Sequence, residues 1–196
     1  MRLRYVCITL ILGGCALGGS AQTGSTAAKV AIGTQMSPVQ AQEELLTLFE
    51  KEFMGVAQAM PADKYGFAPT TATFAPSQGA KYAGVRTFAQ EISHVTTANY
   101  YFASKIIGER MPVDPKSIES LTTKEGLLKA AADSFAYAHK ALATITAQNA
   151  YTTIDGVDGL HTRSVVASFI SAHGFDHYGQ MVEYLRMNGV VPPGSK

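Results

Sequence analysis

Hydrophobic residues recur at helical spacing in four long stretches of this chain, and no stretch shows convincing strand alternation. The first begins at Ser37, where Ser37 and Gln40 fit a capping box, and stops before Pro61. The others cover about residues 85–108, 122–145 and 162–188, with Thr122 and Glu125 as a second capping-box pattern. We therefore expect an all-α fold, an antiparallel four-helix bundle.

The connections between these stretches differ in length. Residues 61–84 are rich in Pro, Ala, Gly and Thr and show neither the helical nor the strand period of hydrophobic residues, which predicts a long ordered loop. Loops of this length inside a domain are often functional. The first-to-second and third-to-fourth connections both exceed a minimal hairpin, so they have room for additional short elements.

The first 36 residues have the character of an export signal and a tether. Arg2 and Arg4 precede a short apolar run and then small residues, which predicts a signal peptide over residues 1–21, cleaved after Ala21. A lipobox ending at Cys15 is the alternative, and it would leave a lipid-anchored chain. Residues 22–36 then form a flexible tether, and residues 37–194 form the bundle domain.

The composition of the chain limits the classes of partner and of chemistry that we expect. The formal charge is +1 and there is no basic stripe, which argues against a nucleic-acid partner. The N-terminal apolar run is too short for a permanent membrane-spanning helix. Both cysteines, Cys7 and Cys15, lie in the predicted signal peptide, so cysteine-based catalysis is not expected. An export signal before a domain without cysteines predicts that the protein is located in the periplasm or cell envelope of a bacterium.

Two histidines on the fourth stretch are the first candidates for chemistry. His173 and His177 are one helical turn apart on a stripe that is mostly apolar, from Val166 to Tyr184, so both rings should face the interior. A buried polar group without a partner destabilises the fold by about 1–3 kcal/mol. A divalent cation would satisfy both rings, since histidines at i and i+4 can bind one ion.

A third ligand has to come from another helix. His94 is the best candidate because it lies within the second stretch among apolar neighbours. The second stretch is apolar over most of its circumference, so its periodicity alone does not turn His94 inward. His139 and His161 are the competing candidates, and a structural or solvated role suits them better.

The segments "HGFDHYGQMVEYLRMNGVVPP" and "ISHVTTANYYF" together resemble the DinB-like superfamily of metal-binding four-helix bundles. The resemblance covers about residues 37–194. In that family, one histidine of the second helix and a His-x-x-x-His pair of the fourth hold a divalent ion. The resemblance therefore implies His94, His173 and His177 as the metal ligands.

Three neutral imidazoles leave the ion with its full charge and an open coordination position. Such an ion is a Lewis acid that can lower the pKa of a bound water to about 7 or hold a thiolate. Imidazole ligands suit Zn or Ni best among several divalent metals. Glu91, Asp176 and Gln180 are candidates for orienting the imidazoles or the water, although a surface role is the simpler interpretation for both carboxylates. Tyr100, Tyr101, Phe102 and Tyr178 are further candidates for lining a pocket.

Members of the family include thiol-dependent S-transferases that use bacillithiol or mycothiol, and others are proposed hydrolases. The resemblance thus implies a metal-dependent hydrolase or transferase acting on a small molecule through activated water or thiol. Export favours hydrolysis, because those thiols are cytosolic. A non-catalytic metal- or ligand-binding bundle and a purely structural bundle are the alternatives. Homodimers are common in the family, and the sequence itself carries no independent sign of one.

Overall fold

The structure is a computed structural model, and it describes residues 30–73, 75 and 78–195. The predicted signal peptide, the alternative lipobox and residues 22–29 of the predicted tether lie outside the described residues. Contacts divide the chain into two units, residues 1–34 and 35–196. In the first unit, the described residues 30–34 contain a turn in which the backbone N–H of Thr34 donates to the carbonyl oxygen of Ala31. All further description concerns the second unit.

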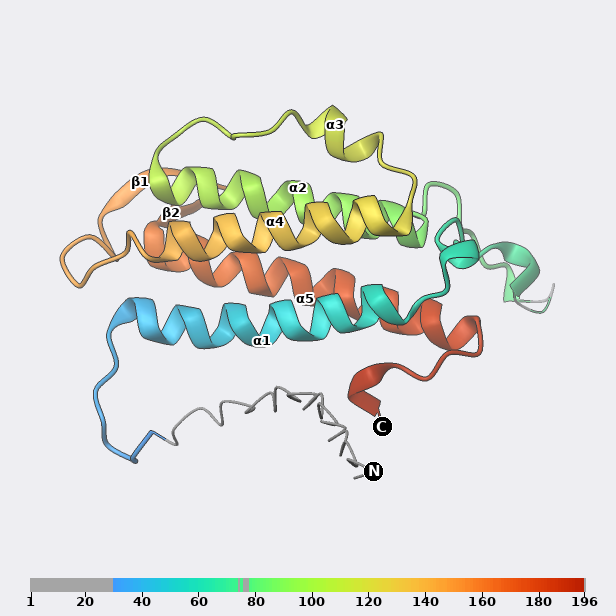
Figure 1. Cartoon of the computed structure of the whole chain (residues 1–196), viewed down its shortest axis with the longest axis horizontal. Helices are drawn as coiled ribbons and strands as arrows, with labels where there is room; N and C mark the ends of the chain where they lie inside the picture. Colours follow the sequence, from blue (N-terminus) through green and yellow to red (C-terminus); the bar gives the residue numbers. More distant parts are fainter. Residues whose placement is uncertain (1–29, 74, 76–77, 196) are drawn as a thin grey trace, which may run out of the picture. The chain divides into compact units, whose positions relative to one another are not determined.

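Four long helices carry the fold, so the prediction of a mostly helical chain is confirmed (Figure 1). Their bounds are α1 (Pro38–Ala59), α2 (Phe88–Ile107), α4 (Lys124–Leu142) and α5 (Arg163–Met187). Helices α1 and α2 each contact both α4 and α5, so each long helix packs against two others. The predicted boundaries hold to within a few residues.

Capping residues explain where the helices begin. The predicted capping box is present: the Ser37 side chain accepts from the backbone N–H of Gln40, and the Gln40 side chain accepts from the backbone N–H of Ser37. Helix α2 begins three residues later than predicted because Thr87 caps it and its side chain accepts from the backbone N–H of Gln90. At the start of α4 the prediction was wrong by one residue. Thr123, not Thr122, is the cap and accepts from Gly126.

Phenylalanines fill the space between α1 and α4. Phe49, Phe53 and Phe135 are fully buried. The ring centroid of Phe135 lies 5.3 Å from that of Phe49 and 5.8 Å from that of Phe53, both in edge-to-face geometry. Such pairs add about 0.5–1.5 kcal/mol each beyond the burial of their area. This cluster holds α1 against α4.

One glycine sets the distance between α1 and α5. A Cβ at Gly174 would lie 2.0 Å from Cζ of Phe49, a contact that no folded protein accommodates without movement. The ring of Phe49 is enclosed by other aromatic rings and cannot turn away. Gly174 therefore lets α5 approach α1 closely, directly beside His173.

Short elements occupy the connections. They are the 3₁₀ turns η1 (Ala62–Lys64), η2 (Thr71–Thr73) and η4 (Pro193–Ser195), the helix α3 (Pro115–Glu119), and the strands β1 (Thr153–Val157) and β2 (Leu160–Thr162). The two strands pair antiparallel through a two-residue turn at Asp158 and Gly159, whose φ angles are +48° and +82°. These angles belong to the tight hairpin turn that Asp-Gly favours. The all-α prediction missed this hairpin.

No helix in the described part of the chain combines the length and the apolar character that a transmembrane span requires.

Candidate metal centre

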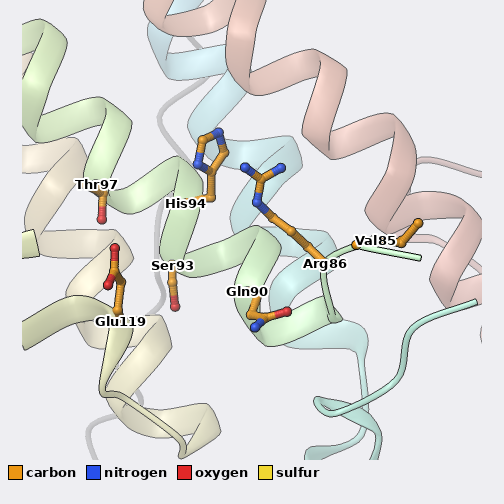
Figure 2. Close-up of a pocket in the computed structure, with 8 residues that line it drawn as sticks. Val85, Arg86, Gln90, Ser93, His94, Thr97 and Glu119 are labelled. Atoms are coloured by element: carbon orange, nitrogen blue, oxygen red, sulfur yellow. The ribbon is translucent and has the colours of Figure 1, made fainter. Parts of the chain in front are cut away.

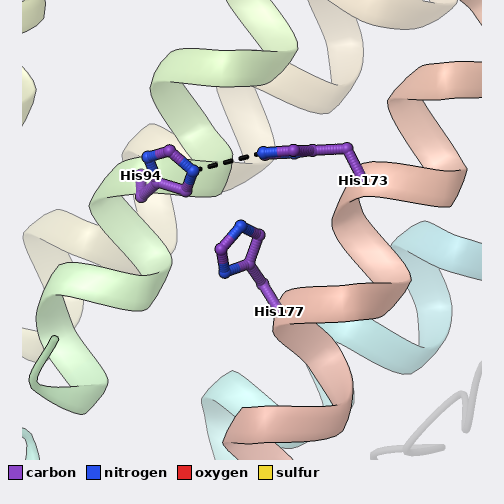
Figure 3. A group of neighbouring side chains, drawn as sticks. All are labelled: His94, His173 and His177. Atoms are coloured by element: carbon purple, nitrogen blue, oxygen red, sulfur yellow. Dashed lines mark hydrogen bonds between the residues drawn. The ribbon is translucent and has the colours of Figure 1, made fainter. Parts of the chain in front are cut away.

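Three histidine rings from two helices meet between α2 and α5 (Figure 3). His94 belongs to α2, whereas His173 and His177 lie one turn apart on α5. Each ring offers one nitrogen, and these three atoms lie within 4.8 Å of one another. The structure thus brings together the three residues that the sequence singled out.

The spacing of the nitrogens suits a common ion. Nε2 of His94 and Nε2 of His173 are 3.2 Å apart. Two imidazole nitrogens bound tetrahedrally to one zinc ion, each at about 2.0–2.1 Å, are separated by about 3.3 Å. The donor set is all nitrogen, which fits a transition metal and not Mg²⁺ or Ca²⁺.

Glu91 determines which nitrogen of His177 is free. Its Oε2 lies 2.6 Å from Nδ1 of His177, and the carboxylate is only 1% exposed. With Glu91 ionised, Nδ1 carries the proton and donates to it, which leaves the lone pair on Nε2. A carboxylate behind a histidine is a common way to fix the tautomer and orientation of a metal ligand. Of Glu91, Asp176 and Gln180, the residues considered for orienting a ligand, Glu91 is the one with a hydrogen bond to one of the three rings.

Burial and the charges around them keep the rings of His94 and His173 neutral. Burial, followed by the positive charge of Arg86 and the neighbouring histidines, lowers the pKa of His94 to about 4. The pKa of His173 is also lowered, mainly by burial and next by His177. Both rings are therefore unprotonated at neutral pH, which is the form that binds a cation.

Aromatic side chains cover one side of the histidine group. The ring centroid of Phe102, on α2, lies 5.4 Å from that of His173 in edge-to-face geometry, and the centroid of Phe169 lies 5.9 Å away. Phe102 is buried and packs on Phe169. These contacts restrict rotation of the His173 ring and exclude water from that side.

A cavity of about 520 Å³ opens beside His94 (Figure 2). It runs along α2 and the segment before it, and Glu119 of α3 contributes to its wall. Its lining residues are Gly84, Val85, Arg86, Gln90, Ser93, His94, Thr97 and Glu119. This volume lies within the usual range for small-molecule sites, about 300–1,000 Å³. Of the three histidines, His94 is therefore the one that faces this cavity.

Comparison with known proteins agrees with this architecture. The family model of the DinB superfamily matches residues 45–181. The chain belongs to the DinB superfamily. A crystal structure of a DinB-like protein from Bacillus cereus ATCC 10987 superimposes with a TM-score of 0.65 at 15% identity, covering 83% of this chain and 100% of that chain. At that identity the likeness concerns the fold. The comparison with curated proteins gave no match.

In the described part of this DinB-superfamily chain, none of the remaining candidates is hydrogen-bonded to the three rings, although the charge of Asp176 acts on His173. Asp176 is exposed, and neither Asp176 nor Gln180 has a hydrogen bond to the three histidines within the described residues. His161 is exposed on β2. His139 lies between α4 and α1, where its two ring nitrogens contact the carboxylates of Glu43 and Glu50.

His139 is thus a structural histidine. Burial lowers its pKa, but hydrogen bonds to Glu50 and Glu43 outweigh that effect, and the net pKa is raised. The protonated ring then bridges two carboxylates of α1 from its place on α4.

The aromatic residues considered for a pocket take different roles. Phe102 contacts His173, whereas Tyr101 lines a second cavity with Lys105 and Asp155. Tyr100 is buried against Tyr137. The hydroxyl of Tyr178 donates to Glu52 on α1. These four side chains therefore do not line one common pocket.

Arg86 is the residue of the site that sequence reasoning missed. It precedes the cap of α2, lines the cavity with His94, and acts electrostatically on His94 and His173. From the sequence, Arg86 falls at the start of the second helical stretch, where a single arginine carries no signal of a site; in the structure it precedes the helix. Its relation to the histidines arises only from the fold.

Proposed function

We propose that this protein is an exported metal-dependent enzyme built on a four-helix bundle. His94, His173 and His177 would hold a divalent ion, and a small molecule would reach it through the cavity beside His94. The observation that carries the proposal is the convergence of three imidazole nitrogens next to an open cavity. Within the described residues the group contains no fourth ligand, which would leave coordination positions for substrate or water.

The residues around the ion would have separate tasks. A divalent ion supplies Lewis acidity there, which activates water or a thiol for attack on a small electrophile. Glu91 holds the proton at Nδ1 of His177 and so keeps Nε2 available. Phe102 and Phe169 hold the ring of His173 and exclude water behind it. Membership in the DinB superfamily supports the same ligand set.

Zn or Ni is the expected ion, because three imidazoles suit both metals. Hydrolysis is favoured over thiol transfer. The predicted signal peptide would carry the protein into the periplasm or cell envelope, away from the cytosolic thiols that some relatives use. Cell fractionation checks the location, and N-terminal sequencing of the mature protein distinguishes cleavage after Ala21 from lipidation at Cys15.

Elemental analysis of tag-free protein tests the metal site. We expect about one equivalent of metal in the wild type and in His161→Ala, a control at an exposed histidine, and much less in His94→Ala and His177→Ala. Equal metal content in all four proteins would remove the proposed site.

Turnover of the metal-loaded protein tests the catalytic step. The panel comprises ester, amide, phosphoester and thiol-transfer substrates, and activity should disappear in His94→Ala. A metal-loaded wild type that is inactive on the whole panel would favour a non-catalytic binding module. A fourth side-chain ligand in a metal-bound crystal structure would favour that alternative as well.

A further inference from the structure

The position of Arg86 beside the three histidines calls for a physical reason. Figure 2 shows its side chain and the ring of His94 projecting to the same side of α2, and both line the cavity. Arg86 is also one of the charges that lower the pKa of His94 and of His173. A fixed positive charge at this place opposes the binding of a cation by the histidines. Arg86 is exposed, so solvent screens this effect, and Asp176 acts on His173 in the opposite sense, but metal binding alone gives no reason for an arginine at this place.

The backbone of Arg86 is held in place by the helix that carries two of the histidines. The hydroxyl of Tyr184, on α5, donates to the carbonyl oxygen of Arg86 over 3.1 Å. On the N-terminal side, the N–H of Val85 donates to the carbonyl oxygen of Tyr82. On the C-terminal side, Thr87 caps α2. The placement of Arg86 next to the histidines is thus a built feature of the fold.

The guanidinium of Arg86 has no acidic partner within the part of the chain that the structure describes. The ion pairs of the described residues do not include it. Glu91, the nearest carboxylate in the sequence, is buried and engaged with His177. An arginine that faces a cavity without a carboxylate partner retains its planar set of donors for a ligand.

We propose that Arg86 binds an oxyanion group of the substrate, a carboxylate or a phosphate, beside the metal ion. An oxyanion between the guanidinium and the ion would neutralise their mutual repulsion, and the planar fork of arginine matches two oxygens of such a group. Glu119 lines the same cavity and, in the view of Figure 2, lies on the other side of Ser93 from Arg86. Its negative charge disfavours a second anionic group at that end. The substrate class is a small molecule with its negative charge at one end.

This inference rests on the proposed function, because the ion forms the second half of the anion site. The test therefore starts with Co(II), an ion with a visible spectrum that responds to its ligands. Wild type, Arg86→Gln, Arg86→Lys and Arg110→Gln are loaded with Co(II), and their metal content is measured. Arg110 is an exposed arginine on the second cavity and is the matched control. We expect equal Co(II) uptake in all four proteins.

Each loaded protein is then titrated with benzoate, phenylphosphonate and the neutral benzamide, and the change in the Co(II) spectrum is followed. Arg86→Gln should weaken binding of at least one of the two anions about tenfold or more, since a bidentate charged contact is lost, and should leave benzamide unaffected. Arg86→Lys should give an intermediate affinity because the charge remains and the fork is lost. Arg110→Gln should behave as wild type.

The anion whose affinity falls more in Arg86→Gln shows whether the substrate carries a carboxylate, as benzoate does, or a phosphate-like group, as phenylphosphonate does. Normal Co(II) uptake with equal anion affinities in wild type and Arg86→Gln would overturn the role of Arg86 and leave the proposed function standing. Failure of the wild type to take up Co(II) would overturn both.

Discussion

Replacing Glu91 by Gln removes the charge behind His177 while nearly preserving the shape of the side chain. In the wild type the carboxylate accepts from Nδ1 of His177 over 2.6 Å, and it is 1% exposed, so no bulk water can substitute for it. The amide of a glutamine accepts this hydrogen bond more weakly. It can also turn and donate to Nδ1, which moves the ring proton to Nε2 and blocks the ligand atom.

The structure allows the size of this effect to be stated. Loss of a charged group from a hydrogen bond of this kind weakens metal affinity about 10- to 100-fold in known histidine sites. This corresponds to about 1.4–2.7 kcal/mol in the free energy of metal binding. Because the bond here is short and buried, we expect Glu91→Gln to fall in the upper half of that range.

Competition with a chromophoric zinc chelator measures the dissociation constant of the zinc complex for wild type and for Glu91→Gln. The control is Asp176→Asn, which removes a carboxylate adjacent to His177 in sequence but exposed to solvent. It should stay within about twofold of wild type, since an exposed charge in water acts weakly. A Glu91→Gln protein that binds zinc as tightly as Asp176→Asn would refute the claim that Glu91 prepares His177 for a cation.

Three further predictions concern stability without metal. Gly174→Ala drives a Cβ into the ring of Phe49 and should destabilise the fold by about 1–3 kcal/mol in denaturant unfolding, and a normal midpoint would contradict the close approach of the helices. The raised pKa of His139 means that its protonated form stabilises the fold below about pH 6.5 and that this contribution is lost as pH rises through the folded-state pKa. The stability difference between wild type and His139→Gln should therefore shrink from pH 6 to pH 9 in thermal unfolding, and a constant difference would count against the bridge. His177→Ala leaves the buried carboxylate of Glu91 without its partner and should lower the free energy of unfolding of the apoprotein by about 3 kcal/mol. The double variant with Glu91→Gln should regain part of this stability, and no gain would show that the carboxylate is not the cause.

The helices and the pair His173 and His177 could be predicted because their signals are local. The start of α1 follows from the capping box at Ser37 and Gln40, and the spacing of His173 and His177 places both rings on one face. The β1–β2 hairpin escaped because its strands have five and three residues, too few for an alternating pattern to emerge. Only the Asp-Gly pair marked its turn.

The surroundings of the histidines depend on the packing of distant segments. Glu91 was a candidate from the sequence, but its contact with His177 requires that α2 and α5 pack in one particular register. The inward direction of His94 is set in the same way, since α2 is apolar on several faces. Arg86 was not a candidate at all, because the stretch that contains it was expected to be helical and its neighbours come from the tertiary fold alone.

His94 and His173 are separated by 79 positions along the chain, yet their rings touch. An ion held by both would tie α2 to α5 across that length, much as a disulfide ties two segments of a chain. The only cysteines of this chain are Cys7 and Cys15, so residues 30–195 have no covalent tie of that kind. Removal of the ion by a chelator would then loosen the packing of α2 against α5 first. A protease should therefore cleave α2 or α5 before it cleaves α1 or α4.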